Sequence, residues 1–421
     1  MLKIQYVKYR EGFMKIRSIV SAALVFTLLL SGCGSAVQNG SSGSNSSSRS
    51  NGSSESNGSG SSASSGVETE EKTPELTLEQ KVGQLFIIRP DVLDSETYTA
   101  EQCNDVKAEG ATEVNDAIRT NIKKYQVGGV CQFSKNILDP DQITKFNADL
   151  QSASDIPMFI AVDEEGGSVA RLANTETFDL PKYESAAAVG EKGTDAAYKM
   201  GNTIGNYVKK YGFNIDFAPD ADVNTNPNNP VIGTRAFSSD AAKAAELAKS
   251  AGKGIADAGV IPTFKHFPGH GDTAEDSHTG FAYSYRTLEE IKGCELLPFE
   301  AASEVGQHAI MVSHISMPNV TGDDTPATLS EQIVSLIPDA DHTLIITDSL
   351  SMQAITDTYS SGEAAVKAFQ AGCDVLLMPY DFVEAYDAVL AACKDGTISM
   401  ERLDKSVNKI LSYKAGFDNG K

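Results

Sequence analysis

Leu344-Ile345-Ile346-Thr347-Asp348 is an apolar run that ends at a carboxylate. Short apolar runs of this kind are typical of strands buried on both faces, as in parallel sheets. Eight such runs, each followed by loop residues and a stretch with helical periodicity, recur along the chain at residues 84–88, 128–133, 158–162, 214–219, 260–266, 309–313, 344–347 and 374–378. This order predicts a single (β/α)8 barrel of the α/β class.

The barrel is expected to occupy residues 76–421, which leaves no room for a second large domain. Residues 301–310 and 364–372 have the apolar spacing of helices that pack on a barrel. The segment that follows, residues 372–378, is expected to end the second of these helices and enter the eighth strand.

The N-terminal residues indicate export. Residues 14–17 are basic, residues 19–30 are apolar but too few to span a bilayer, and Leu30-Ser31-Gly32-Cys33 resembles a lipobox. We therefore expect a lipoprotein signal peptide at residues 1–32, lipidation of Cys33, and an extracytoplasmic protein anchored to the cell membrane. The alternative is a chance cysteine after a short signal. Residues 33–75 are dominated by Ser, Gly and Asn, which predicts a flexible tether.

Composition argues against several classes of partner. The chain carries 35 basic and 57 acidic residues, a net charge of −22, which disfavours nucleic acid and anionic membrane surfaces as partners. Beyond Cys33, the cysteines are odd in number and lack the spacing of a disulfide framework, and Cys131 and Cys373 are expected to be buried thiols. The chain has no Trp, so any aromatic stacking on a ligand must come from Tyr or Phe.

A loop between residues 265 and 278 places a carboxylate, Asp276, two residues before an imidazole, His278. Gly269 and Gly271 keep this loop bendable, so the carboxylate can fold back onto the ring. A carboxylate that accepts one imidazole N–H leaves the other ring nitrogen free to carry a proton to or from a substrate. The pattern predicts an acid/base pair.

Asp348 is a candidate nucleophile, because the carboxyl ends of parallel strands are where α/β folds collect their catalytic groups. An Asp directly after a strand is also a common helix N-cap, and the sequence leaves both interpretations open. Titratable side chains follow other runs in the same way and should meet at one barrel mouth: Asp163, Glu165, Asp220, Asp222, Lys265, His266 and His314.

The histidines of the loop also invite a metal interpretation. His266, His270 and His278 with Asp272 and Asp276 offer enough donors, but their spacing matches no zinc motif, and we expect no catalytic metal and no cofactor. His270 is expected to lock the loop through hydrogen bonds. His314 is expected to be a pocket-wall or structural residue.

Three separated segments resemble the signatures of glycoside hydrolase family 3, and most closely its β-N-acetylhexosaminidase branch. They are residues 162–172 (VDEEGGSVARL), 265–278 (KHFPGHGDTAEDSH) and 346–352 (ITDSLSM). The resemblance implies that Asp348 is the nucleophile, His278 the general acid/base, and Asp276 the residue that orients His278. It also implies that the sugar is held by Asp163, Arg171, Arg235, Lys265 and His266.

The chain departs from the family pattern at two positions. Glu164 stands where the family more often has an amide, and Ser168 where it often has an arginine. We therefore expect a changed polarity at the edge of the sugar pocket.

The resemblance implies a retaining exo-β-N-acetylglucosaminidase that acts on peptidoglycan fragments or chitin-type oligosaccharides through a glycosyl-aspartate. The alternatives are a β-glucosidase or an N-acetylglucosaminide phosphorylase of the same family, and a sugar-binding lipoprotein without turnover. The presence of Asp348, Asp276 and His278 argues against a pure binder, which has no use for a nucleophile.

Overall fold

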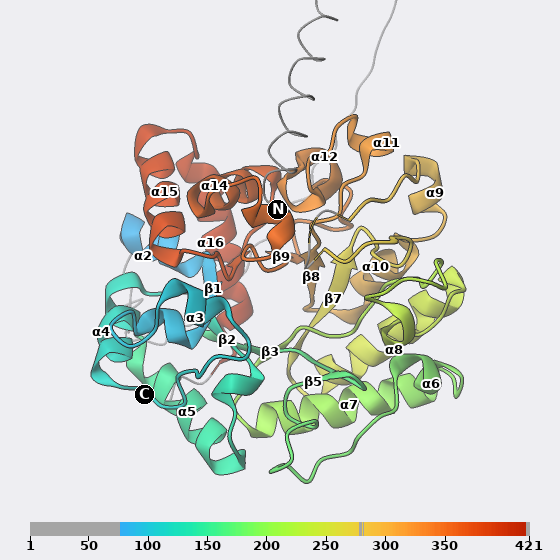
Figure 1. Cartoon of the computed structure of the whole chain (residues 1–421), viewed down its shortest axis with the longest axis horizontal. Coiled ribbons are helices and arrows are strands. Elements are labelled where there is room, and N and C mark those ends of the chain that lie inside the picture. Colours follow the sequence, from blue (N-terminus) through green and yellow to red (C-terminus); the bar gives the residue numbers. More distant parts are fainter. Residues whose placement is uncertain (1–75, 278–279, 281, 418–421) are drawn as a thin grey trace, which may run out of the picture. The chain divides into compact units, whose positions relative to one another are not determined.

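The computed structural model describes residues 76–277, 280 and 282–417. Its centre is a parallel sheet of eight strands in the order β10-β1-β2-β3-β6-β7-β8-β9 (Figure 1). The strands are β1 (Phe86–Ile88), β2 (Gly129–Gln132), β3 (Phe159–Val162), β6 (Ile215–Asp216), β7 (Ile261–Phe267), β8 (Ala309–Val312), β9 (Leu344–Thr347) and β10 (Leu376–Leu377). Each apolar run identified in the sequence coincides with one of these strands, and only β7 extends beyond its run, by one residue to Phe267.

The sheet closes on itself. At one end of the order, β10 pairs with β1 in parallel, with Phe86 beside Leu376. At the other end, Ile346 of β9 forms a parallel bridge with Val375, the residue before β10, and the Thr347 amide donates to the Val375 carbonyl at 3.0 Å. The predicted (β/α)8 barrel is therefore confirmed.

Every residue of these strands is buried, because the barrel interior covers one face and helices cover the other. Cys131 on β2 and Cys373 before β10 are buried thiols, as predicted. The helices surround the strands in Figure 1. They are α2 (Leu78–Gln84), α3 (Ala100–Asn104), α4 (Asp116–Tyr125), α5 (Pro140–Ala153), α6 (Ala186–Gly190), α7 (Thr194–Lys210), α8 (Ala241–Asp257), α9 (Leu288–Lys292), α10 (Leu297–Ala302), α11 (Pro318–Thr321), α12 (Glu331–Val334), α13 (Gln353–Thr356), α14 (Ser361–Ala371), α15 (Phe382–Asp395) and α16 (Met400–Lys414).

The two helices expected from apolar spacing had different outcomes. Residues 364–371 fall in α14, which ends at Ala371 with Gly372 at its C-cap before β10, as predicted. The helix expected over residues 301–310 was wrong: α10 ends at Ala302, a short 3-10 turn follows, and β8 begins at Ala309. Gly306, at φ +83°, ends the 3-10 turn in a conformation that no helix continues.

Adjacent helices pack closely where glycine leaves room. In α7, a Cβ on Gly201 would lie 2.0 Å from the Ala251 carbonyl oxygen of α8. In α8, a Cβ on Gly254 would lie 2.3 Å from the Tyr198 carbonyl oxygen of α7. The missing side chains therefore allow the two backbones to approach each other on the outside of the barrel.

One small element was not expected from the sequence. After β3, the strands β4 (Glu164–Gly166) and β5 (Val169–Ala170) form an antiparallel hairpin that turns through Gly166 and Gly167, both at positive φ. The hairpin starts directly after Asp163 and places Glu165 and Arg171 beside the barrel mouth. It belongs to the site.

Within the described part of the chain, no helix is long and apolar enough to cross a membrane. The predicted signal peptide, Cys33 and the tether lie outside the described residues, and so does His278. The predictions made for them remain predictions.

Candidate active site

A cavity of about 800 Å³ opens at the carboxyl ends of the barrel strands. Its volume lies within the usual range for pockets that bind small molecules. Loops after several strands contribute to its wall, because the carboxyl ends of all eight strands meet at this mouth. The residues that the sequence assigned to the sugar and to nucleophilic attack all line it: Asp163, Arg171, Arg235, Lys265, His266 and Asp348.

A network of opposite charges forms one half of this pocket. The Nζ atom of Lys265 lies 2.8 Å from Oδ1 of Asp163 and 2.7 Å from Oε1 of Glu165. Arg235 donates two parallel hydrogen bonds to Glu165, at 2.7 and 2.9 Å. Arg171 approaches Asp163 at 3.4 Å. Each carboxylate is therefore held in a fixed place by cations, with polar atoms left toward the cavity.

The charges of this network stabilise one another despite their burial. Burial alone raises the pKa of Glu165, but Arg235 and Lys265 hold that pKa well below its usual value. Burial likewise opposes the charge of Lys265, yet Asp163 and Glu165 raise its pKa above the usual value. Glu165 and Lys265 therefore both stay ionised across the physiological pH range. A fixed array of charges of this kind can bind hydroxyl groups from both donor and acceptor sides.

His266 is held in one orientation by a buried carboxylate. Its Nδ1 atom lies 2.7 Å from Oδ2 of Asp222, and its Nε2 atom lies 3.2 Å from Nη2 of Arg235. Because the guanidinium is a donor only, Nε2 must accept, and the proton of the neutral ring must be on Nδ1. The peptide bonds Lys265–His266 and Phe267–Pro268 are cis.

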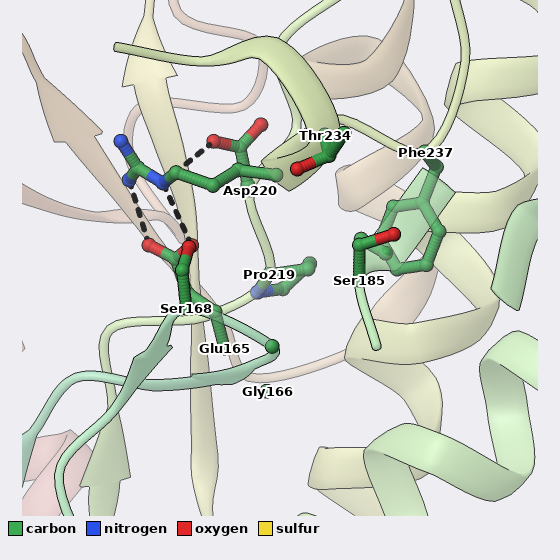
Figure 2. A pocket seen from close by; sticks show the side chains of 11 residues that line it. Glu165, Gly166, Ser168, Ser185, Pro219, Asp220, Thr234 and Phe237 are labelled. Carbon is green, nitrogen blue, oxygen red and sulfur yellow. Dashed lines mark hydrogen bonds and ion pairs between the residues drawn. The ribbon is translucent and has the colours of Figure 1, made fainter. Parts of the chain in front are cut away.

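Asp220 lies on the other side of Arg235, with Oδ2 3.7 Å from Nε of Arg235 (Figure 2). Burial and the neighbouring Asp222 raise the pKa of Asp220 well above its usual value, so this carboxyl binds a proton readily. For Asp222, burial acts in the same direction, but His266 and the amide of His270 keep its pKa low. The pKa values of the two carboxyls are thus shifted in opposite directions.

Asp220, Asp222 and His266 have ligand atoms within 4.8 Å of one another, the spacing needed to hold a cation. This set differs from the loop residues that the sequence offered for a metal. His266 already donates to Asp222, and the Arg235 guanidinium already supplies positive charge to Asp220. The donors are therefore committed to the hydrogen-bonded network described above.

Asp348 leads into a loop, and no helix starts there: α13 begins at Gln353 and has Met352 at its N-cap position. The helix N-cap interpretation of Asp348 was therefore wrong. Its Oδ1 atom accepts the Ser349 amide at 2.7 Å, and the carboxyl lines the pocket. His314, fully buried, donates to the Ser349 carbonyl at 2.8 Å, so the structural role expected for it is confirmed.

The loop after β7 is anchored by His270, as predicted. The buried ring of His270 lies 2.7 Å from the Thr273 hydroxyl and 2.9 Å from the Ser277 hydroxyl. Asp276, next to Ser277, is half-buried. It is not among the described residues that line the pocket. Since His278 lies outside the described residues, the acid/base pair remains a prediction.

Of the two departures from the family pattern, one does not act as expected. Glu164 is fully buried and faces away from the pocket: its carboxyl accepts the amides of Leu172 and Ala173 and the hydroxyl of Tyr207. The expectation that it changes the pocket's edge was wrong, because Glu164 holds the β4–β5 hairpin in place. Ser168 lines a small hollow beside Glu165 and Asp220 (Figure 2).

The sequence did not single out several residues that line the pocket. Arg89, Phe133 and Ser351 belong to its wall. Asp222, which the sequence did place at the barrel mouth, does not line the pocket and instead contacts His266. Arg89 follows the first strand directly, and Phe133 follows β2. Their positions at strand ends were a usable signal, whereas the place of Ser351 depends on the path of the loop after Asp348.

The fold and the pocket together define a (β/α)8-barrel protein whose functional groups lie at the carboxyl ends of the strands, the arrangement of barrel enzymes. Residues 77–413 match the model of the glycosyl hydrolase family 3 N-terminal domain. The chain belongs to glycosyl hydrolase family 3.

Several relatives share most of the barrel. The chain is 34% identical to β-hexosaminidase A of Pseudoalteromonas piscicida over 375 residues, 80% of this chain and 61% of that protein. It is 31% identical to β-hexosaminidase LpqI of Mycobacterium tuberculosis (strain ATCC 25618 / H37Rv), over 72% of this chain and 80% of that protein. A solved β-N-acetylglucosaminidase from Paenibacillus sp. str. FPU-7 is similar with a TM-score of 0.72 and 37% identity, over 81% of this chain and 62% of that chain. The chain thus spans less than two thirds of two of these proteins.

Proposed function

We propose that this chain is a retaining exo-β-N-acetylglucosaminidase that removes terminal β-linked N-acetylglucosamine. The observation that carries the proposal is the position of Asp348, which shares one pocket with the Asp163, Lys265 and Arg235 network. The network offers donors and acceptors for sugar hydroxyls, and the carboxylate is an attacking group in the same cavity. The names of the relatives, β-hexosaminidase and β-N-acetylglucosaminidase, support an amino sugar.

The first chemical step requires a nucleophile and an acid. Asp348 attacks the anomeric carbon as the bond to the leaving oxygen breaks, and His278 protonates that oxygen. Asp276 orients His278 and favours its protonated form. The products of this step are a glycosyl-Asp348 ester and the free leaving group.

In the second step, the neutral His278 removes a proton from water, and the water oxygen attacks the anomeric carbon. The bond to Asp348 breaks, and the sugar leaves with its β configuration retained after two inversions. The roles of Asp163, Arg171, Arg235, Lys265 and His266 in this scheme are to hold and orient the sugar ring.

We further propose that the substrates are peptidoglycan fragments or chitin-type oligosaccharides met outside the cell, with the enzyme attached to the membrane by a lipid on Cys33. Support for the anchor is the basic, apolar and lipobox-like succession of residues 14–33. Metabolic labelling with a fatty-acid analogue, compared between the wild type and Cys33→Ala, tests the anchor.

Hydrolysis of 4-nitrophenyl N-acetyl-β-glucosaminide, compared with the plain β-glucoside, tests the activity. We expect cleavage of the first at a kcat/KM at least about tenfold higher, and direct detection of β-N-acetylglucosamine as the first product. Preference for the plain glucoside would make the protein a β-glucosidase. Binding of N-acetylglucosamine without cleavage of either compound would make it a sugar-binding protein.

A further inference from the structure

Arg89 is a buried cation that lines the pocket without a carboxylate partner. Arg89 is 6% exposed. Among the described residues, no carboxylate forms a salt bridge with it. The acceptors around its guanidinium are neutral: Asn104 Oδ1 at 2.9 Å and the Ser351 hydroxyl at 3.4 Å. The amide nitrogen of Asn104 donates to two backbone carbonyls, so its oxygen is directed to Arg89.

Asp91, the carboxylate closest to Arg89 along the β1 segment, forms its contacts with other residues. Asp91 lies two residues further on, but its Oδ2 atom pairs with Lys135 at 2.8 Å. Its Oδ1 atom accepts the amide of Ala111 at 2.6 Å and the side chain of Asn136 at 2.9 Å. Asp91 therefore contacts Lys135, Ala111 and Asn136 rather than Arg89, and Lys135 is its ion-pair partner.

A second guanidinium lies on the same aromatic ring. Arg89 and Arg171 both stack on Phe133, at 5.1 and 5.6 Å from the ring centroid. The Nε atoms of both arginines are buried and have no hydrogen-bond partner. Both arginines, Phe133 and Ser351 line the cavity that also contains Asp348.

The pocket therefore has two electrostatically different halves. On the β3 and β7 side, the cations Lys265 and Arg235 are matched by Asp163 and Glu165. On the β1 and β2 side, no carboxylate of the described residues forms an ion pair with Arg89, and burial lowers the pKa of the guanidinium although the charge of Asp91 acts in the opposite direction. A buried charge without a counter-charge is costly, and a bound anion removes that cost.

We propose that Arg89, supported by Ser351 and by Arg171 across Phe133, is an anion subsite of this pocket that binds a carboxylate or phosphate group. The inference rests on the proposed function and extends it to an anionic group carried by the substrate or the acceptor. Arginine suits this task because its planar donors match an oxyanion in two parallel hydrogen bonds.

Two sources can supply such an anion. A carboxylate can be carried by the leaving group, as in N-acetylmuramic acid, which would direct the enzyme to peptidoglycan fragments rather than to neutral chitin-type sugars. Alternatively, free inorganic phosphate can replace water in the second step: a phosphate oxygen forms a bond to the anomeric carbon as the bond to Asp348 breaks. That step releases a sugar 1-phosphate and the free Asp348 carboxylate.

The carboxylate source is tested with two disaccharides that differ only in charge: N-acetylglucosamine β-1,4-linked to N-acetylmuramic acid, and the same compound with its carboxyl converted to a primary amide. We expect the wild type to favour the acid. In Arg89→Met, the ratio of kcat/KM for the acid to kcat/KM for the amide should fall about 10- to 100-fold, the range of a charged hydrogen bond. Arg89→Lys should keep part of the ratio.

The phosphate source is tested with the amide disaccharide and inorganic phosphate. If phosphate is the anion, the wild type forms sugar 1-phosphate, and Arg89→Met shifts the product to the free sugar. An unchanged acid-to-amide ratio in Arg89→Met, together with unchanged products in phosphate, would overturn the subsite.

Two measurements keep this test separate from the proposed function. Calorimetric titration of inorganic phosphate into the wild type and Arg89→Met reports anion binding without turnover, and loss of binding in the variant supports the subsite even if no glucosaminide is cleaved. Arg119→Met, on α4 outside the pocket wall, makes the same charge change and should leave the acid-to-amide ratio as it is. Thermal melting of each variant checks that the barrel is intact.

Discussion

The Nδ1 atom of His266 lies 2.7 Å from Oδ2 of Asp222, and both residues are buried, although only His266 lines the pocket. This contact assigns the proton of the neutral ring to Nδ1 and leaves Nε2 to accept from Arg235. Arg235 in turn binds Glu165. Asp222, which does not line the pocket, therefore fixes the orientation of His266 and, through it, the arrangement of Arg235 and Glu165.

Asp222→Asn should disturb this arrangement. Both oxygens of Asp222 accept hydrogen bonds, one from His266 Nδ1 and one from the backbone N–H of His270 at 2.6 Å. In Asp222→Asn, the side-chain NH2 group replaces one oxygen and faces one of these two N–H donors. We expect a loss of stability of about 1–3 kcal/mol. We also expect kcat/KM on an N-acetylglucosaminide to fall about 10- to 100-fold, measured with steady-state kinetics and thermal melting.

Asp220→Asn is the matched control for that variant. Because the pKa of Asp220 is already raised by burial and by Asp222, a neutral amide resembles its protonated form. We expect a smaller loss than for Asp222→Asn. Equal losses in both variants would contradict the assignment of the ionised carboxylate to Asp222.

Asp348→Ala should reduce turnover by at least about 1,000-fold while leaving the fold intact, because the proposed covalent intermediate forms on this carboxylate. Azide added to this variant should restore part of the activity and give the α-glycosyl azide, since the small anion enters the space left by the carboxylate. Product stereochemistry is measured by NMR. Wild-type turnover in Asp348→Ala would remove this residue from the role of nucleophile.

His278→Ala should affect substrates unequally. A leaving group such as 4-nitrophenolate departs without much protonation, whereas a sugar alcohol needs an acid. We expect kcat/KM to fall at least about 100-fold more on a disaccharide than on the 4-nitrophenyl substrate. A plot of rate against leaving-group pKa measures this difference, and parallel losses on both substrates would assign His278 another role.

Stability should fall as the pH drops through the range in which the unfolded chain protonates His308. Burial lowers the pKa of His308 below its usual value of 6.5, so the folded protein binds fewer protons than the unfolded chain at that site. The free energy of unfolding therefore rises with pH across this window and is lost as the pH falls below about 6.5. In His308→Asn, which keeps a donor to the Gly306 carbonyl, thermal melting between about pH 5 and 7 should show a shallower slope. An unchanged slope would show that His308 does not contribute to it.

Some features escaped the sequence because side-chain direction is not a local property. Glu164 and Glu165 are neighbours in one hairpin, yet Glu164 binds backbone amides in the interior and Glu165 binds Arg235 and Lys265 at the pocket. Residues 301–310 have helical spacing, but the turn at Gly306 and pairing with β7 and β9 place the end of that segment in a strand. Tertiary pairing overrides local periodicity in such short segments.

By itself, the sequence determined the barrel and the meeting place of its polar groups, because eight buried strands in parallel order bring every carboxyl end to one mouth. From that principle the sequence predicts that Asp163, Lys265 and Asp348 lie at one mouth, and in the structure they line one cavity. Only the tertiary structure decided which charges are balanced there. The lack of an ion pair at Arg89 and the hydrogen bond that orients His266 on Asp222 both depend on contacts between loops far apart in the chain. At such contacts, a shift of a few ångströms decides whether a buried charge has a partner.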